Sequence, residues 1–228
     1  MSMTHVGGPL RVGNFFGRNG SADQPGGQMA VESVYDVVPA TLSTTAVAAA
    51  QAVAGAGNLT INGASASGGV ATFDVPRAVQ IVSSNAGDTT QTALFTGKDD
   101  YGVTMSELLA FNGTTPVLGQ KAFKTITQVA ISAALAGNAS AGNTDIFGLP
   151  YAIASVNYIM AVKWAGALAD DAATVAAADA TSPATTTTND VRGTVDPSSA
   201  ADGSRRLTVY MLLANPNSRQ GLYGVTQA

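Results

Sequence analysis

The sequence predicts an all-β protein built as an antiparallel β-sandwich, and two observations support this. Between residues 72 and 151, short alternating apolar segments are separated by polar turns bounded by glycine, at intervals of about ten to twelve residues. Runs with helical periodicity are short and consist mostly of alanine. Helix is therefore expected to be a minor component.

Individual strands follow from alternation of apolar and polar residues. The clearest is 206–213, where Leu207, Val209, Met211 and Leu213 share one face. The other expected strands are 29–38, 70–75, 79–83, 90–95, 103–109, 124–131 and 151–162, with Trp164 closing the end of a strand. Residues 59–63 alternate and end in Asn-Gly, which predicts a hairpin. Residues 46–54 fit either a strand or a short helix.

The chain divides into an arm and one domain. Residues 1–28 are rich in Gly and Pro but include aromatic residues, which predicts an extended N-terminal arm; a loose terminus is the alternative. Residues 29–228 are expected to form a single β-sandwich domain. Within it, residues 165–203 change composition to Ala, Asp and Thr, which predicts a long loop excursion in which 172–180 could form a short helix.

Composition excludes several classes of partner and site. Charged residues make up 11% of the chain and the net charge is -4, so no basic surface is expected for nucleic acid. The absence of cysteine excludes disulfides and thiolate chemistry. No apolar run approaches the length of a membrane span, and residues 1–20 lack the pattern of a secretory signal. We therefore expect a soluble protein made in the cytoplasm.

No group of side chains suggests catalysis or a cofactor. His5 is the only histidine and lies in the arm. Asp99-Asp100 and Asp170-Asp171 are adjacent pairs, and adjacent residues in extended chain point to opposite faces, so neither pair alone can flank a scissile bond. Residues 98–102 could offer oxygen ligands to calcium, but a polar hairpin turn is the favoured interpretation. We expect a protein that is not an enzyme.

An ordered set of motifs between residues 46 and 213 resembles virion structural proteins of tailed bacteriophages. The motifs are Phe73-Asp74-Val75-Pro76-Arg77, Thr96-Gly97-x-Asp99-x-Tyr101-Gly102, Lys121-Ala122-Phe123-Lys124-Thr125-Ile126, Gly148-Leu149-Pro150-Tyr151, Asp190-Val191-Arg192-Gly193-Thr194 and Pro197-x-x-Ala200-x-Asp202-Gly203. The resemblance implies an accessory head protein of the decoration or cement kind, with a jelly-roll or related β-sandwich body. Its partner would be the major capsid protein and its location the capsid surface of the virion.

The arm and the excursion are the expected contact regions, because neither is needed to close the sandwich. The candidate contact residues are Phe15, Phe16, Arg11 and Arg18 in the arm, and Asp190 and Arg192 in the excursion. Closed symmetry, with a trimer favoured, is the expected assembly. The alternative is a tail, fibre or vertex β-sandwich that binds a receptor or glycan, which copy number per virion would distinguish.

Overall fold

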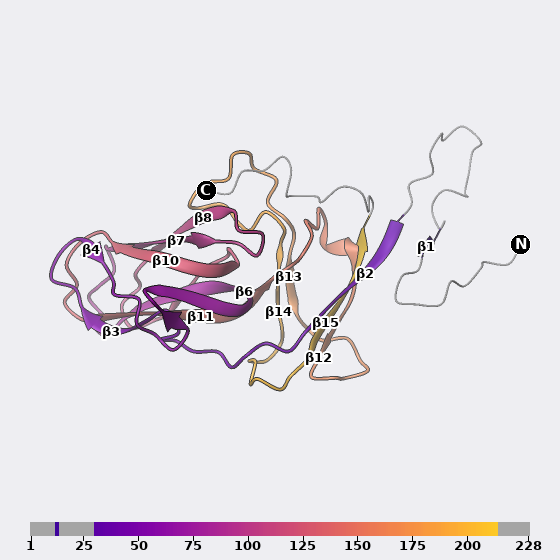
Figure 1. The fold of residues 1–228 in the computed structure, drawn as a ribbon, viewed down its shortest axis with the longest axis horizontal. Helices are drawn as coiled ribbons and strands as arrows, with labels where there is room; N and C mark the ends of the chain where they lie inside the picture. Colours follow the sequence, from indigo (N-terminus) through magenta and orange to yellow (C-terminus); the bar gives the residue numbers. More distant parts are fainter. Residues whose placement is uncertain (1–11, 14–29, 214–228) are drawn as a thin grey trace, which may run out of the picture.

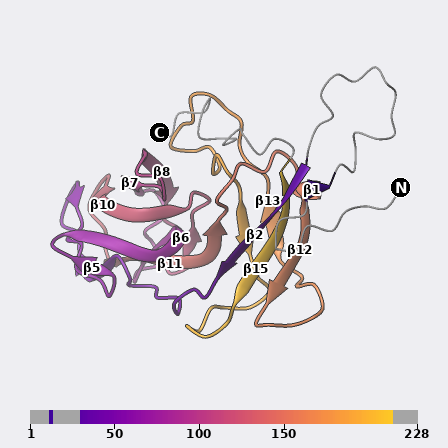
Figure 2. The same cartoon turned by 45° about the vertical axis from the view of Figure 1, so that its right-hand side comes forward.

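In the computed structural model, which describes residues 12–13 and 30–213, the chain forms two antiparallel sheets (Figure 1). The smaller sheet has the strand order β1-β2-β15-β12, and Figure 2 shows it from a second side. Its strands are β1 (Val12–Gly13), β2 (Ala30–Val37), β15 (Leu207–Leu213) and β12 (Ile159–Trp164). Strands from the two ends of the described chain therefore lie side by side.

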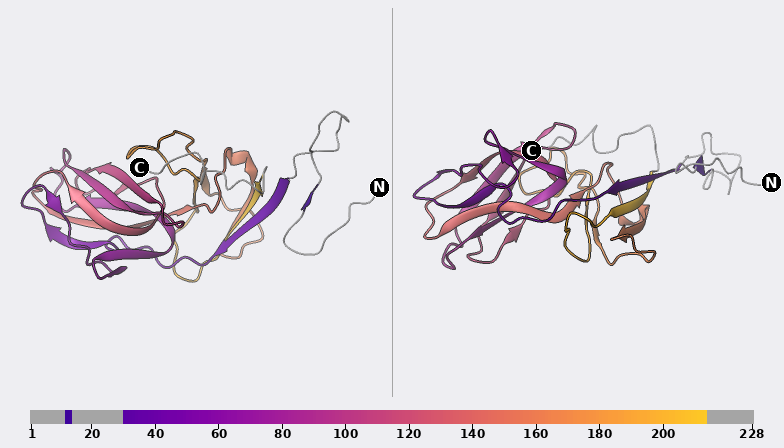
Figure 3. Two further views of the ribbon diagram at one scale, coloured as in Figure 1. Left: turned by 45° about the horizontal axis from the view of Figure 1, so that its top comes forward. Right: turned by 60° about the horizontal axis from the view of Figure 1, so that its bottom comes forward.

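The larger sheet curls at the other end of the molecule, as the two views of Figure 3 show. Its main path is β13-β14-β11-β6-β10-β7-β8, and β3, β4, β5 and β9 pair with strands along that path. The bounds are β3 (Ala48–Ala52), β4 (Gly57–Asn58), β5 (Ala66–Ser67), β6 (Val70–Ser83), β7 (Thr92–Lys98), β8 (Thr104–Ala110), β9 (Val117–Leu118), β10 (Phe123–Ile131), β11 (Asn138–Gly148), β13 (Thr174–Ala176) and β14 (Thr194–Asp196).

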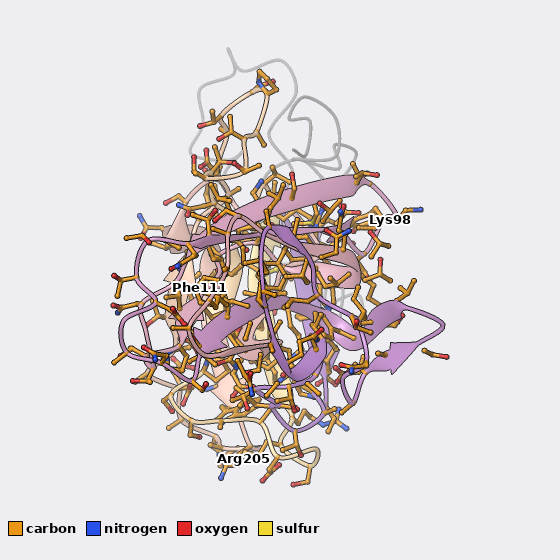
Figure 4. All side chains as sticks on the ribbon, turned by 90° about the vertical axis from the view of Figure 1, so that its left-hand side faces the viewer. Lys98, Phe111 and Arg205 are labelled. Atoms are coloured by element: carbon orange, nitrogen blue, oxygen red, sulfur yellow. The ribbon has the colours of Figure 1, made fainter. Side chains whose placement is uncertain are left out.

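Two clusters of buried apolar side chains form the core. The first lies inside the larger sheet and includes Phe95 and Phe123. The second joins the sheets, because Leu207 and Val209 of β15 pack with Phe147 of β11. In an end view, Phe111, a member of the first cluster, lies within the outline of the body and left of its centre, whereas Lys98 and Arg205 lie at its borders (Figure 4).

The predicted all-β, antiparallel class is confirmed, and the jelly-roll connectivity stays a prediction. The expected strands at 29–38, 90–95, 103–109, 124–131 and 206–213 correspond to β2, β7, β8, β10 and β15. Trp164 ends β12, as expected. The turn at 98–102 joins β7 to β8, with Gly102 at a φ of 79°.

The break expected between residues 75 and 79 is wrong, since β6 runs through Pro76 as one strand. Proline has no N–H to give to a neighbouring strand. The partner strand β10 shifts register at this point, pairing Phe123 with Arg77 but Thr125 with Thr72. Because of this shift in register, no backbone N–H is needed from Pro76 for the pairing with β10. Strand β6 therefore continues through Pro76.

Three other expectations need correction or refinement. Residues 59–63 are not a strand; the Gly68-Gly69 turn, with both φ angles positive, joins β5 to β6 instead. The ambiguous segment at 46–54 contains β3, so the strand alternative holds. In the expected strand 151–162, only the part from Ile159 onward is strand. Before it, Ile153 N donates to the carbonyl oxygen of Arg192, and residues Val156–Tyr158 form a 3₁₀ turn, η1.

Strand β11 was not predicted, although it lies between β14 and β6 in the larger sheet. Its sequence, Asn-Ala-Ser-Ala-Gly-Asn-Thr-Asp-Ile-Phe-Gly, has few of the branched and aromatic residues that favour strands. Small residues are needed there, because a Cβ on Gly142 would overlap the carbonyl oxygen of Ser43. Close packing therefore selects residues that propensity disfavours.

The excursion at 165–203 is not a free loop. It contains β13 and β14, which pair with each other, and β14 also pairs with β11. The helix considered at 172–180 is wrong, because β13 occupies its centre. In the described residues, no helix combines the length and apolar character needed to cross a membrane. The proposed arm at 1–28 lies outside the described residues except for β1.

Candidate functional site

Five buried charged side chains from four parts of the chain meet beneath the middle of the excursion, residues 177–192. They are Asp99, Glu107, Lys121, Asp190 and Arg192, each with at most 4% of its surface exposed, and we call them the charge network. Asp99 follows β7, Glu107 lies in β8, Lys121 precedes β10, and Asp190 and Arg192 precede β14. Charges this deeply buried require specific partners.

Arg192 ties the excursion to the β7–β8 turn. Its Nη1 donates to Asp99 Oδ2 at 2.8 Å, and its Nε donates to the carbonyl oxygen of Leu149 at 3.2 Å. The guanidinium also lies 5.2 Å from the ring centroid of Tyr101. Asp99 in turn accepts the backbone N–H groups of Tyr101 and Val103 through Oδ1. The ion pair therefore fixes the turn and the excursion in one arrangement.

Asp190 connects the same excursion to the start of β10. Its Oδ2 accepts the N–H of Ala122 at 3.0 Å, and its Oδ1 accepts the N–H of Arg192 at 2.8 Å. Burial raises the pKa of Asp190, although the nearby Arg192 acts in the opposite direction. Both oxygens of this carboxylate are thus bonded inside the protein.

Glu107 and Lys121 form the other side of the charge network. Glu107 Oε1 accepts the N–H groups of Gln120 and Lys121, at 2.5 and 3.3 Å. Lys121 Nζ donates to the carbonyl oxygen of Thr185 at 2.7 Å. Burial is the main cause that lowers the pKa of Lys121. The Lys121 ammonium therefore holds the excursion in place through the backbone of Thr185.

The network loop, residues 177–192, is held by backbone contacts as well. Leu108 N donates to the carbonyl oxygen of Thr186, and Ala178 N donates to that of Ile153. In Figure 1 this loop arches above β8. Most of its exposed residues carry hydroxyl or amide side chains, and the full set is Ala180, Thr181, Ser182, Pro183, Thr185, Thr187 and Asn189. A polar surface is thus displayed on a firmly anchored base.

The predicted contact residues have different outcomes. Asp190 and Arg192 are each 1% exposed and bonded within the chain, so they cannot serve as surface contacts and act instead as internal anchors. They were named as contact candidates from the sequence because the excursion is not needed to close the sandwich. Phe15, Phe16, Arg11 and Arg18 lie outside the described residues.

Arg77 forms a second buried junction, between the sheets. Its Nε donates to the carbonyl oxygen of Thr144, its Nη1 to that of Ala40, and its Nη2 to Asp145 Oδ1, all at 2.8–2.9 Å. Its guanidinium lies 5.1 Å from the ring centroid of Phe147. Residue 40 belongs to the segment that leads from β2 of the smaller sheet, so Arg77 links that segment to the larger sheet.

The paired carboxylates turn toward different partners. Asp99 faces Arg192, whereas Asp100 lies 3.7 Å from Lys124. Asp170 pairs with Lys163 at 2.7 Å, whereas Asp171 accepts from Ser198. Within residues 12–13 and 30–213, no three His, Cys, Asp or Glu side chains are grouped to hold a metal ion.

Sequence reasoning missed a set of exposed apolar side chains at the border of the smaller sheet. They lie in η1, along the edge strand β12 and in the loop after it, and we call them the apolar strip: Val156, Tyr158, Met160 and Leu168. Leu168 is 96% exposed and Met160 is 56% exposed. In Figure 2 the loop after β12 projects beyond the end of that strand. The signal that could have found this set is Leu168, a large apolar residue that lies between Ala167 and Ala169 and just before two aspartates.

Comparison of the chain with family models, with curated proteins and with solved structures finds no match.

Proposed function

We propose that the protein binds the outer surface of a tailed-phage capsid and stabilises the shell, as a decoration or cement protein. The observation that carries the proposal is the ordered set of motifs between residues 46 and 213, which resembles phage virion proteins. In this proposal the protein performs no chemistry. Its partner is the major capsid protein.

The motifs that carry the resemblance come together in space. Asp99, Lys121, Asp190 and Arg192 come from three different motifs and meet in the charge network. Arg77, from a fourth motif, forms the junction between the sheets. The shared motifs therefore specify an internal framework, and the capsid contacts belong elsewhere on the surface.

The apolar strip is the contact surface that we assign to the capsid. Large exposed apolar side chains are candidates for a protein interface, and these four lie along or at the ends of one edge strand, β12. Burying Met160 and Leu168 would contribute on the order of 1.5–3 kcal/mol each. The exposed tip of the network loop supplies polar groups for a second contact. Leu168 and the tip of the network loop lie in the excursion, which is one of the two regions named from the sequence as contact candidates, whereas Met160 lies in β12.

A closed oligomer would strengthen these contacts, and a trimer at local threefold positions is the form that we propose. When one subunit binds, the effective concentration of the other two near their sites rises. Preferential binding to assembled capsid subunits then shifts the shell toward the assembled state. Measuring the mass of the purified protein in solution tests the trimer.

The proposal is tested with virions of the phage that encodes the chain. Particles lacking the protein should open at a lower temperature than normal particles, and adding purified protein back should restore the normal temperature. The double variant Met160→Gln, Leu168→Gln should bind about 100-fold or more weakly per subunit, since each buried side chain contributes roughly tenfold or more.

Leu118→Gln is the matched control, because Leu118 is apolar and 47% exposed but lies in β9 of the larger sheet. It should bind like the unchanged protein. Equal opening temperatures with and without the protein would contradict the cement function. A copy number of only a few per virion would instead favour a tail, fibre or vertex protein.

A further inference from the structure

Glu107 closes the contact between β8 and the residues that precede β10. Its side chain is 4% exposed, and Oε1 accepts two backbone N–H groups, from Gln120 and Lys121. Oε2 has no hydrogen-bond partner among the described residues. A Cβ on Gly119 would overlap Oε2, so the glycine backbone packs directly on this oxygen. The carboxyl group is therefore enclosed on this side.

Among the described residues, the five members of the charge network do not balance in charge. The groups that face Glu107 are Lys121 from the segment before β10 and Asp190 from the network loop. Asp190 lies beside Arg192, which is paired with Asp99, and Asp179 of the same loop acts on Lys121. Counted over its five described members alone, the charge network has three carboxylates and two cations, so those members carry one excess negative charge when all are ionised.

Hydrogen bonding identifies the carboxylate that is best placed to accept a proton. Both oxygens of Asp190 accept a backbone N–H, and Asp99 accepts N–H groups at both oxygens. Among the described residues, Glu107 is the member with a bare oxygen, Oε2. A hydrogen bond donated to an ionised oxygen favours the ionised form, so the proton is held most readily by Glu107.

We propose that protonation of Glu107 controls how firmly the network loop is held on the sandwich. With Glu107 protonated, the charge network is neutral and Lys121 is available to the carbonyl oxygen of Thr185. With Glu107 ionised, its charge repels Asp190 and attracts Lys121, which weakens both anchors of the loop. This inference concerns the fold alone and holds whatever partner the protein binds.

The pKa of Glu107 supports this assignment. Burial is the largest cause that raises it, from 4.5 to about 7. Because the pKa in the folded state is the higher one, protonation stabilises the fold. That contribution is fully present below pH 4.5 and is lost as the pH rises through about 7. The loop should therefore loosen on the alkaline side of neutrality.

Hydrogen exchange of the full chain tests the proposal at two amides. Leu108 N donates to Thr186 O, and Ala122 N donates to Asp190 Oδ2, so both report on the anchored loop. Their protection, corrected for the intrinsic effect of pH, should fall about tenfold or more between about pH 5.5 and pH 8. The Glu107 carboxyl carbon, followed by NMR, should titrate near pH 7.

Glu107→Gln keeps the shape and the acceptor oxygen of the side chain but cannot ionise. In this variant the protection of the Leu108 and Ala122 amides should therefore not change with pH. Glu32→Gln, which changes the only other glutamate, should behave like the unchanged protein. If Glu107→Gln does not fold, Asp190→Asn serves instead. Removing the negative charge of Asp190 should lower the pH at which Glu107 is half-titrated. A midpoint near 4.5, or protection that does not change with pH in the unchanged protein, would overturn the proposal.

Discussion

Charged residues in this protein hold segments together from the inside, although charge is scarce along the chain. Arg192 shows how: one side chain reaches Asp99 from the β7–β8 turn and the backbone of Leu149 after β11. Such a pair adds little net stability over an apolar replacement of both members, but it is costly to break from one side. Its main consequence is therefore a single arrangement of the excursion.

At this scale we predict that Arg192→Met lowers the free energy of unfolding by about 3–5 kcal/mol, because it leaves the buried Asp99 without its arginine partner. Arg192→Lys should also destabilise, since an ammonium cannot reproduce both the Nε and Nη1 contacts. Adding Asp99→Asn to Arg192→Met should recover part of the loss. Denaturant unfolding measures all three.

The neighbouring pair Asp100 and Lys124 is the control, because it lies next to the same turn but its side chains are 43% and 30% exposed. Lys124→Met should change the free energy of unfolding by less than about 1 kcal/mol. Similar losses for Lys124→Met and Arg192→Met would show that burial of the Arg192 pair has no special effect.

Among the elements, the strands with strict alternation could be predicted and those shaped by close packing could not. β15 alternates because one face lies on the second core cluster, so period two is visible in the sequence. β11 is enclosed by other segments, so only small side chains fit at several of its positions. Ala139 and Ala141 are fully buried, and Gly142 lies against the backbone of Ser43. The spatial neighbours that impose this choice are distant in sequence.

Gly142→Ala tests this account of β11. The added Cβ would overlap backbone atoms of Ser43 and Thr44, so the change should destabilise by about 1–3 kcal/mol. Gly55→Ala is the matched control: a Cβ added there would meet no atom within 4 Å, and restricting the unfolded chain should leave stability equal or slightly higher. Thermal unfolding compares the two variants. Equal stability of both would contradict the packing explanation.

For the whole molecule, the sequence predicts the all-β antiparallel class but not the candidate site. Asp190 and Arg192 were named as capsid contacts, whereas the structure buries both. Their depth depends on partners 68 and 93 residues away in the chain, and no local pattern records such contacts. The apolar strip was missed because the exposure of Leu168 depends on the position of the loop after β12, which the local sequence does not determine.

The two sheets should unfold together, because the second core cluster contains residues of both and Arg77 joins them. Trp164, the only tryptophan, lies in β12 and packs in the second core cluster, so its fluorescence reports on the smaller sheet and its junction with the larger one. Far-UV circular dichroism reports on all strands, most of which belong to the larger sheet. In the unchanged protein we expect the two signals to change at the same denaturant concentration.

Arg77→Met should separate these two transitions. It removes the donors to Ala40, Thr144 and Asp145, so we expect a loss of about 3–5 kcal/mol and tryptophan fluorescence that changes before circular dichroism. The control is Arg206→Met, which removes an exposed pair with Asp36 and should cost less than about 1 kcal/mol with coincident transitions. Coincident transitions and a loss below about 1 kcal/mol in Arg77→Met would mean that apolar packing alone joins the sheets.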